Sequence, residues 1–344
     1  MRIYLFFISL FVVLISCKKD KPIDPKTNSE ISMSNHTVLV INEGNYGWGN
    51  ASISLYDPNS NAVSLDYFKQ QNGNTNLGDV CQSVTKYNNY YYIVVNNSNK
   101  IVVVNASDFT KKNTITGFNS PRYILPISSN KAYVSDLYAN SIQIVDLNSN
   151  VITGSIACMK GTQEMVYSDN KVFVTNSNSN YCYVINTISN EMTDSILVGK
   201  DASSIVLDKQ SKIWVLSKGS PAINQLGSLN CINPTTLVVE KKLIFNAGEN
   251  PWRLNINKTR DTLYYLNKGV YQFPITNATL LSSPLIVQGT KLFYGLGINS
   301  KDYSIYVSDA IDYVQKSKIE IYSVNGTFIK SFNSGIISNG FVFE

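Results

Sequence analysis

The chain has 344 residues, of which 44% are hydrophobic, and a formal net charge of only +5. This apolar content is enough for a sizeable buried core and excludes a disordered chain. Five basic and three acidic residues fall within the first 30 positions, which leaves 24 basic against 21 acidic residues elsewhere. Because nucleic-acid-binding domains carry a clear basic surplus, no nucleic-acid partner is expected.

Residues 1–16 are predicted to be a signal peptide. Arg2 precedes an apolar run at residues 3–15, which is shorter than the about 20 residues needed to span a bilayer. The following motif, LISC at residues 14–17, resembles the bacterial lipobox, in which the cysteine is diacylated and becomes the first mature residue. We therefore expect lipidation at Cys17 and a membrane contact through the lipid anchor only. The alternative is a plain secretory signal with an incidental cysteine.

The lipidated cysteine is followed by a polar segment, so residues 17–36 are expected to form a flexible tether. The segment contains Pro22 and Pro25 together with Ser, Asn and Lys, and it has no apolar periodicity. Such a composition does not bury enough apolar surface to fold. The single folded domain is then expected to span residues 37–344.

A short apolar segment that ends in a small polar residue recurs seven times after the tether, at spacings of 40 to 54 residues. The segments are VLVIN ending at Asn42, YIVVN at Asn96, AYVSD at Asp136, VFVTN at Asn176, IWVLS at Ser217, LYYLN at Asn267 and IYVSD at Asp309. Most are followed by a second run rich in Val, Ile and Tyr. A β-only repeat of about forty residues is typical of a propeller blade with four strands.

The first and last repeats are complementary. The first begins directly at Thr37 with no strand before it, and the chain ends in ISNGFVFE with nothing after it. Calling the strands of a blade a to d from the channel outward, we expect Gly340 to Glu344 to return as strand a of the first blade. The predicted fold is an all-β, seven-bladed β-propeller, closed by the C-terminal strand joining the first blade.

Catalytic side chains are scarce in the predicted domain. The one histidine is His36, in the tether, which excludes a Ser-His-Asp triad and a His-ligated zinc within the domain. Asp136 and Asp309 occupy the strand-end position that Asn fills in other repeats, where short polar side chains cap turns. We therefore expect no enzyme activity, no catalytic residue, no metal and no cofactor.

The cysteines after the tether are Cys81, Cys158, Cys182 and Cys231. None forms a CxxC pair, and small buried side chains are the expected interpretation. One disulfide is the alternative in an oxidising compartment.

A binding surface is easier to locate, because the b–c and d–a loops of all blades meet around one mouth of the central channel. These loops are rich in aromatic and amide side chains, which suit a large amide-bearing ligand or a protein surface. The candidate ligand-binding residues are Glu43, Asn45, Tyr46, Trp48, Asp79, Gln82, Arg122, Tyr138, Asn178, Lys218, Trp252, Arg253, Lys268 and Tyr294.

Some of these candidates have a structural alternative. Trp252 suits packing under a neighbouring blade, and Arg122 and Arg253 occupy matching positions that suit ion pairs between blades. The first b–c loop, residues 42–50, combines three glycines with Tyr46 and Trp48. Because glycine permits unusual backbone angles that present side chains, this loop is expected to be functional.

The run NEGNYGWGNASISLYDP at residues 42–58, with LGDVCQS at residues 77–83 and the repeated YVSD and VFVTN strands, resembles the YncE-like propeller lipoproteins of Bacteroidetes, which include the cobalamin-binding BtuG family. The resemblance covers the predicted domain. It implies a lipid-anchored protein of the outer membrane, exposed at the cell surface. Such a protein binds cobalamin or a related corrinoid as a ligand and passes it to a TonB-dependent outer-membrane transporter.

Two other classes of function remain open. A surface propeller that binds protein or glycan partners without catalysis would use the same loops. A lyase or lactonase would need a metal held at the channel mouth by carboxylates and amides such as Glu43, Asp136, Asn176 and Asp309.

Overall fold

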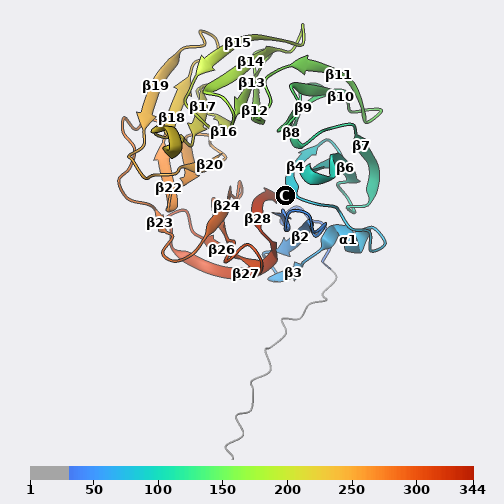
Figure 1. Cartoon of the computed structure of the whole chain (residues 1–344). Coiled ribbons are helices and arrows are strands. Elements are labelled where there is room, and N and C mark those ends of the chain that lie inside the picture. Colours follow the sequence, from blue (N-terminus) through green and yellow to red (C-terminus); the bar gives the residue numbers. More distant parts are fainter. Residues whose placement is uncertain (1–30) are drawn as a thin grey trace, which may run out of the picture.

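The computed structural model describes residues 31–344, which form seven four-stranded antiparallel sheets. The sheets stand side by side in a ring around a central channel, in the order of the sequence (Figure 1). The predicted seven-bladed β-propeller is therefore confirmed. Each expected repeat segment supplies strand b of one blade. Strand b is buried on both faces between neighbouring blades, which explains why its sequence is a nearly continuous apolar run.

The first four blades each have four strands, in the following order from the channel outward. Blade one comprises β28 (Ser338–Phe343), β1 (Val38–Asn42), β2 (Ser52–Asp57) and β3 (Ala62–Ser64). Blade two comprises β4 (Cys81–Tyr87), β5 (Tyr90–Val95), β6 (Lys100–Asn105) and β7 (Lys111–Thr116). Blade three comprises β8 (Pro121–Pro126), β9 (Lys131–Asp136), β10 (Ser141–Asp146) and β11 (Val151–Ala157). Blade four comprises β12 (Thr162–Ser168), β13 (Lys171–Asn176), β14 (Tyr181–Asn186) and β15 (Glu191–Leu197).

The remaining three blades follow the same order. Blade five comprises β16 (Ala202–Leu207), β17 (Ile213–Ser217), β18 (Ser228–Ile232) and β19 (Val239–Ile244). Blade six comprises β20 (Trp252–Ile256), β21 (Thr262–Leu266), β22 (Gly269–Pro274) and β23 (Ile286–Val287). Blade seven comprises β24 (Phe293–Ile298), β25 (Ile305–Asp309), β26 (Lys316–Tyr322) and β27 (Phe328–Ile336). Short helical turns lie in the loops at α1 (Tyr67–Gln71), η1 (Asn96–Ser98) and η2 (Pro221–Ile223). No helix in residues 31–344 is long and apolar enough to cross a membrane.

The ring closes as the sequence predicts. β28 pairs antiparallel with β1, with Val38 opposite Phe343 and Ile41 opposite Gly340. The closing strand begins at Ser338, two residues before its expected start. Asn42 strengthens the junction, because its side-chain oxygen accepts hydrogen bonds from the hydroxyls of Ser334 (3.0 Å) and Ser338 (2.6 Å). β28 therefore covers the inner edge of β1 and becomes the channel-facing strand of blade one, as strand a does in the other blades.

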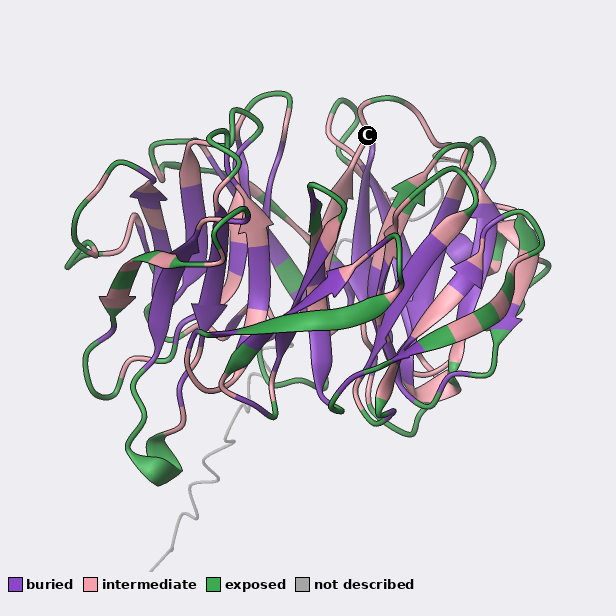
Figure 2. Cartoon of the chain, turned by 90° about the horizontal axis from the view of Figure 1, so that it is seen from above, coloured by how far each residue is buried: buried purple, intermediate pink, exposed green. Residues whose placement is uncertain are grey.

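The core lies between blades rather than within one central cluster. Figure 2 shows buried residues along the strands and exposed residues mainly on loops at both ends of the disc and on outer strands. One such contact joins Trp214 of β17 to Phe273 of β22, whose rings meet edge to face at 5.7 Å. The four cysteines of the domain are buried and unpaired, which confirms small buried side chains rather than the alternative disulfide.

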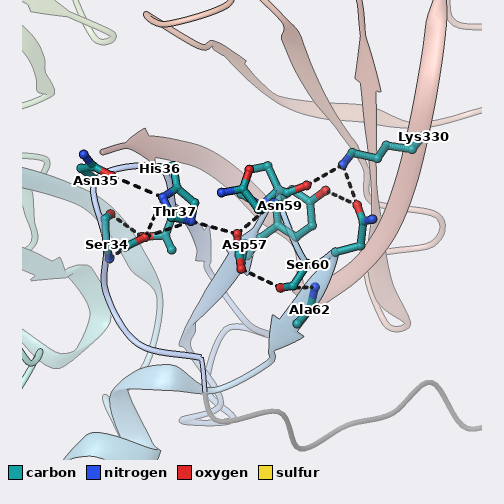
Figure 3. Close-up of polar contacts among 12 residues, drawn as sticks. Ser34, Asn35, His36, Thr37, Asp57, Asn59, Ser60, Ala62 and Lys330 are labelled. Atoms are coloured by element: carbon teal, nitrogen blue, oxygen red, sulfur yellow. Dashed lines mark hydrogen bonds and ion pairs between the residues drawn. The ribbon is translucent and has the colours of Figure 1, made fainter.

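The end of the predicted tether differs from expectation. Ile31 and Met33 pack against the core between the first two blades. His36 approaches Asp57 at 3.2 Å between Nε2 and Oδ1, as Figure 3 shows. Residues 31–36 therefore belong to the folded domain, because apolar and polar contacts fix them. The expected signal peptide, Cys17 and the rest of the tether lie outside the described residues.

Candidate functional site

Each innermost strand carries the same irregularity near its start. In all seven blades the pairing of strand a with strand b shifts register there, which leaves one extra residue on strand a. Such a β-bulge re-aims a side chain. The second residue of each strand a lies at this shift, and we call these residues the bulge ring: Asn339, Gln82, Arg122, Gln163, Ser203, Arg253 and Tyr294.

The bulge ring lines the channel near the end where the b–c and d–a loops emerge. Six of its members line a cavity of about 220 Å³ at this mouth, together with Glu43, Tyr123, Glu164 and Trp252. A second cavity of about 360 Å³ lies deeper in the channel and has more apolar walls, such as Leu254 and Phe341. Gln82, Tyr123, Glu164 and Arg253 line both cavities, so a polar layer divides the channel.

Glu43 ties three blades together at one side of the mouth cavity. Its carboxylate accepts hydrogen bonds from Tyr294 Oη (3.0 Å) and Asn339 Nδ2 (2.8 Å). Arg253 Nη2 lies 3.7 Å from Glu43 Oε1. The pairing confirms that Arg253 forms an ion pair between blades. Burial, followed by the nearby Glu43 carboxylate, raises the pKa of Tyr294, so the phenol stays protonated as a donor.

Aromatic rings enclose the Arg253 guanidinium. Its central carbon lies 5.3 Å from the Trp252 ring centre and 5.4 Å from that of Tyr294, within cation–π range. The Trp252 and Tyr294 rings meet edge to face at 5.0 Å. Arg253 has a left-handed backbone with φ of 57°, which costs free energy for a residue with a Cβ. The contacts with Glu43 and the two rings offset this cost.

Arg122 lies in a different environment on the other side of the cavity. Its Nε donates to Gln163 Oε1 (2.9 Å), and its Nη1 donates to Gln82 Oε1. Among residues 31–344 it has no carboxylate partner within 4.0 Å. The alternative of an ion pair between blades is therefore wrong for Arg122, which instead bridges neighbouring blades through two neutral amides.

Glu164 is the second carboxyl group of the cavity. It is half-buried, and its Oε2 accepts a hydrogen bond from the Ile205 backbone N–H at 3.1 Å. Burial raises its pKa to about 7, although that hydrogen bond and Arg253 act in the opposite direction. Near neutral pH the cavity therefore carries less negative charge than its two glutamates suggest.

Exposed aromatic side chains surround the mouth on the b–c loops. Tyr46, Trp48 and Tyr138 are 77%, 75% and 67% exposed, which is unusual for large apolar groups. The loop that carries the first two is held in place, because Asp79 Oδ2 accepts hydrogen bonds from the Gly47 backbone N–H (2.8 Å) and Asn97 Nδ2 (2.6 Å). Its turn requires glycine at Gly44, where φ is +73° and a Cβ would lie 2.7 Å from a backbone nitrogen.

The structure divides the predicted site residues into three groups. Those that line the mouth cavity are Glu43, Gln82, Arg122, Trp252, Arg253 and Tyr294. Those on the loops above it, exposed or supporting, are Asn45, Tyr46, Trp48, Asp79 and Tyr138. Those in the b–c loops of blades four to six, which do not line the cavity, are Asn178, Lys218 and Lys268.

The fourteen predicted site residues omit several residues that line the cavities. Tyr123, Glu164 and Ser203 line the mouth cavity, and Asn339 lines the deeper one. A signal was present, since aligning the seven inner strands places Ser203 and Asn339 at the position of Gln82 and Arg122. Tyr123 and Glu164 follow that position by one residue, and only the bulge turns both neighbours toward the channel.

The residues proposed for a metal have other partners. Asp136 accepts four backbone N–H groups, and Asp309 accepts two, which confirms both as caps of turns. Asn176 likewise bonds to backbone groups. In the part of the chain that the structure describes, no group of three His, Cys, Asp or Glu side chains is arranged to hold a metal ion.

Solved structures share the fold at low sequence identity. A quinonprotein alcohol dehydrogenase-like protein from Bacteroides thetaiotaomicron has a TM-score of 0.72 at 14% identity, over 91% of this chain and 79% of that one. A functionally unknown protein from Desulfotomaculum acetoxidans has a TM-score of 0.68 at 12% identity, over 90% and 99%. Hydrazine synthase from Kuenenia stuttgartiensis has a TM-score of 0.62 at 11% identity, over 76% and 88%. These likenesses show the propeller fold alone.

The sequence comparisons give a family. No curated protein matches the chain. The model of a domain of unknown function, DUF5074, matches residues 36–343, which is nearly the whole described propeller. The chain therefore belongs to the DUF5074 family.

Proposed function

We propose that the protein is a lipid-anchored binding propeller that captures cobalamin or a related corrinoid on the face formed by the b–c and d–a loops. One observation carries this proposal. Three aromatic side chains, Tyr46, Trp48 and Tyr138, stand exposed around a cavity lined by amides and arginines. A corrinoid is broad and apolar over its ring and fringed with amides, so it needs both kinds of partner.

The size of the mouth cavity sets how such a ligand would lie. At about 220 Å³ the cavity is smaller than the roughly 300–1,000 Å³ pockets that enclose drug-sized ligands. A corrin ring is larger than those ligands, so it would lie across the mouth against the aromatic side chains. One peripheral group would then enter the cavity and meet the bulge ring.

Glu43, which the lyase or lactonase alternative would use, gives no support for catalysis. Glu43 is already engaged by Tyr294, Asn339 and Arg253, which leaves it poorly placed to transfer a proton. The lipobox-like motif at Cys17 and the resemblance to corrinoid-capturing lipoproteins support a place at the outer-membrane surface. Delivery to a TonB-dependent transporter follows from that resemblance.

Calorimetric titration of the lipid-free protein, residues 18–344, with cyanocobalamin tests the proposal. We expect tight one-to-one binding, and Trp48→Ala should weaken it by about 1–4 kcal/mol, as for an interface anchor. Ile188→Ala is the matched control, since Ile188 is also 77% exposed but lies in the c–d turn between β14 and β15, at the opposite end of the disc. It should leave the affinity unchanged.

Absence of binding heat and of co-eluting red colour at micromolar protein would refute the corrinoid proposal. Glycans and surface proteins would then be the ligands to test on the same face. Binding that is equally strong in the wild type, Trp48→Ala and Tyr138→Ala would keep the ligand but move the site.

A further inference from the structure

Two arginines of the bulge ring occupy matching positions but differ in charge compensation. Arg253 has the Glu43 carboxylate 3.7 Å away. Arg122 is held by the side-chain oxygens of Gln82 and Gln163. An amide oxygen can position a guanidinium, but it supplies no counter-charge. The positive charge of Arg122 is therefore fixed in space and left uncompensated by its direct partners.

The two glutamines are themselves fixed in the orientation that this requires. Both are buried, with 4% and 5% of their surface exposed. Gln82 Nε2 donates to Tyr123 Oη (3.3 Å), and Gln163 Nε2 donates to Ser177 Oγ (3.1 Å). Because each NH₂ group has its own acceptor, each oxygen is directed to the guanidinium. The arrangement is a preformed cradle rather than a chance surface contact.

Arg122 keeps hydrogen-bonding capacity for a ligand. A guanidinium has five N–H groups, and within residues 31–344 the Arg122 side chain donates only through Nε and Nη1. The side chain lines the mouth cavity. Among residues 31–344 no carboxylate lies within 4.0 Å of this half-buried charge, and Glu164, on which it acts through space, is only partly ionised near neutral pH. Incomplete compensation of a buried charge is costly, and the planar fork of arginine suits the paired oxygens of a carboxylate or phosphate.

We propose that the mouth cavity is an oxyanion subsite in which Arg122, cradled by Gln82 and Gln163, binds a carboxylate or phosphate group of the ligand. A cavity of about 220 Å³ has room for such a group but not for a large ligand. The proposal rests on the binding face proposed above and adds that the ligand carries an anionic group. It does not require the ligand to be a corrinoid.

The other charged groups that face the cavity agree with an anion. Glu43 is neutralised by Arg253 and bonded to two donors. Glu164 has a pKa raised to about 7 by burial, so it carries only part of a negative charge at neutral pH. Lowering the pH from 8 to 6 protonates Glu164 and should strengthen anion binding.

Small anions test the subsite without involving the aromatic side chains. Inorganic phosphate is followed by ³¹P line broadening and acetate by proton saturation transfer, each titrated into the lipid-free protein. We expect saturable binding of at least one probe, and the stronger of the two identifies the preferred oxyanion. Phosphate and acetate affinities should both fall by at least about tenfold in Arg122→Gln.

Gln163→Glu is the sharper variant, because it is nearly isosteric and supplies a counter-charge from within the protein. It should reduce anion binding as much as Arg122→Gln does, while Ile188→Ala leaves it unchanged. Wild-type circular dichroism and thermal unfolding in each variant would show that the fold is intact. Saturable binding that persists in both Arg122→Gln and Gln163→Glu, or none of either probe in the wild type, would overturn the subsite.

The two proposals fail separately. Anion binding without cyanocobalamin binding would overturn the corrinoid ligand and keep the subsite. Cyanocobalamin binding with no Arg122-dependent anion binding would do the reverse.

Discussion

The polar residue at the end of strand b differs between blades three and four, and in each blade its type fits the number of hydrogen-bond donors and acceptors around it. Asp136 in blade three is fully buried and accepts backbone N–H groups of Asn119, Ser120, Tyr138 and Ala139 at 2.9–3.0 Å. Asn176 in blade four accepts two N–H groups, but its Nδ2 donates to two carbonyls, those of Met159 and Lys160. A site with four donors requires a carboxylate, and one with two donors and two acceptors requires an amide.

Replacing either residue by the other type should therefore destabilise the folded protein. Asp136→Asn places an NH₂ group against two N–H donors, and Asn176→Asp places a carboxylate oxygen against two carbonyls. Each should lower the free energy of unfolding by about 1–3 kcal/mol, the cost of unsatisfied buried polar groups. Urea unfolding measures this, and Asp169→Asn, in the exposed turn between β12 and β13, is the control. An unchanged transition midpoint in both variants would contradict the matching.

Glu164 gives the stability a pH dependence. Its pKa is raised from 4.5 to about 7 in the folded state, so between these values the folded state retains a proton that the unfolded state loses. The free energy of unfolding contributed by this group therefore falls as pH rises from about 4.5 to 7. Because Glu164 is only partly buried, we expect a loss of about 1–2 kcal/mol rather than the full value of the shift.

Glu164→Gln should remove this dependence. The variant should unfold at higher urea concentration than the wild type at pH 8, and the two should differ much less at pH 4.5. Paired urea titrations at both pH values, monitored by tryptophan fluorescence, measure the difference. Parallel stability curves of the two proteins across this range would show that Glu164 does not titrate in the folded state.

Among the elements, strand a has the largest effect on the site. Its bulge brings two consecutive residues of one strand into the channel, as with Arg122 and Tyr123 or Gln163 and Glu164. Simple alternation of a strand predicts that only one of such a pair faces the channel. The sequence therefore predicts the position of strand a, but the alternating pattern identifies only one of the two consecutive residues that strand a places in the channel.

β28 is the element on which closure depends. Without it, β1 would present an open edge to the channel and lose its pairing from Val38 to Asn42. Removing residues 338–344 should abolish cooperative thermal unfolding of a monomer and promote aggregation. A peptide of these seven residues added in trans should restore the transition by pairing with β1. A truncated protein that unfolds like the wild type would refute this role.

At the scale of the whole molecule, the ring is predictable from the sequence because each blade repeats the same apolar segment and the two chain ends are complementary. The position of residues 31–36 is not predictable, since Ile31 and Met33 are isolated apolar residues in a polar segment. The Arg253–Glu43 pair joins residues more than two hundred positions apart. Such pairs form only when the blades are arranged around the central channel, and a local sequence pattern does not show which residues of distant blades will meet there.

The first described residues also bear on orientation. Residues 34–37 lie beside Asp57, where β1 begins and β2 ends (Figure 3). This is the end of blade one opposite the b–c loops. The described chain therefore enters the disc at the end opposite the candidate binding face, so an anchor at Cys17 would not itself cover that face.

Membrane partition tests this arrangement. The full chain expressed in a bacterium that processes lipoproteins should enter the detergent phase in Triton X-114 separation, and Cys17→Ser should remain in the aqueous phase. Lipidated protein in liposomes should bind cyanocobalamin as tightly as residues 18–344 do in solution, because the bilayer does not cover the face. Detergent partition that survives Cys17→Ser would refute the anchor, and a large loss of affinity on liposomes would instead place the binding face against the membrane.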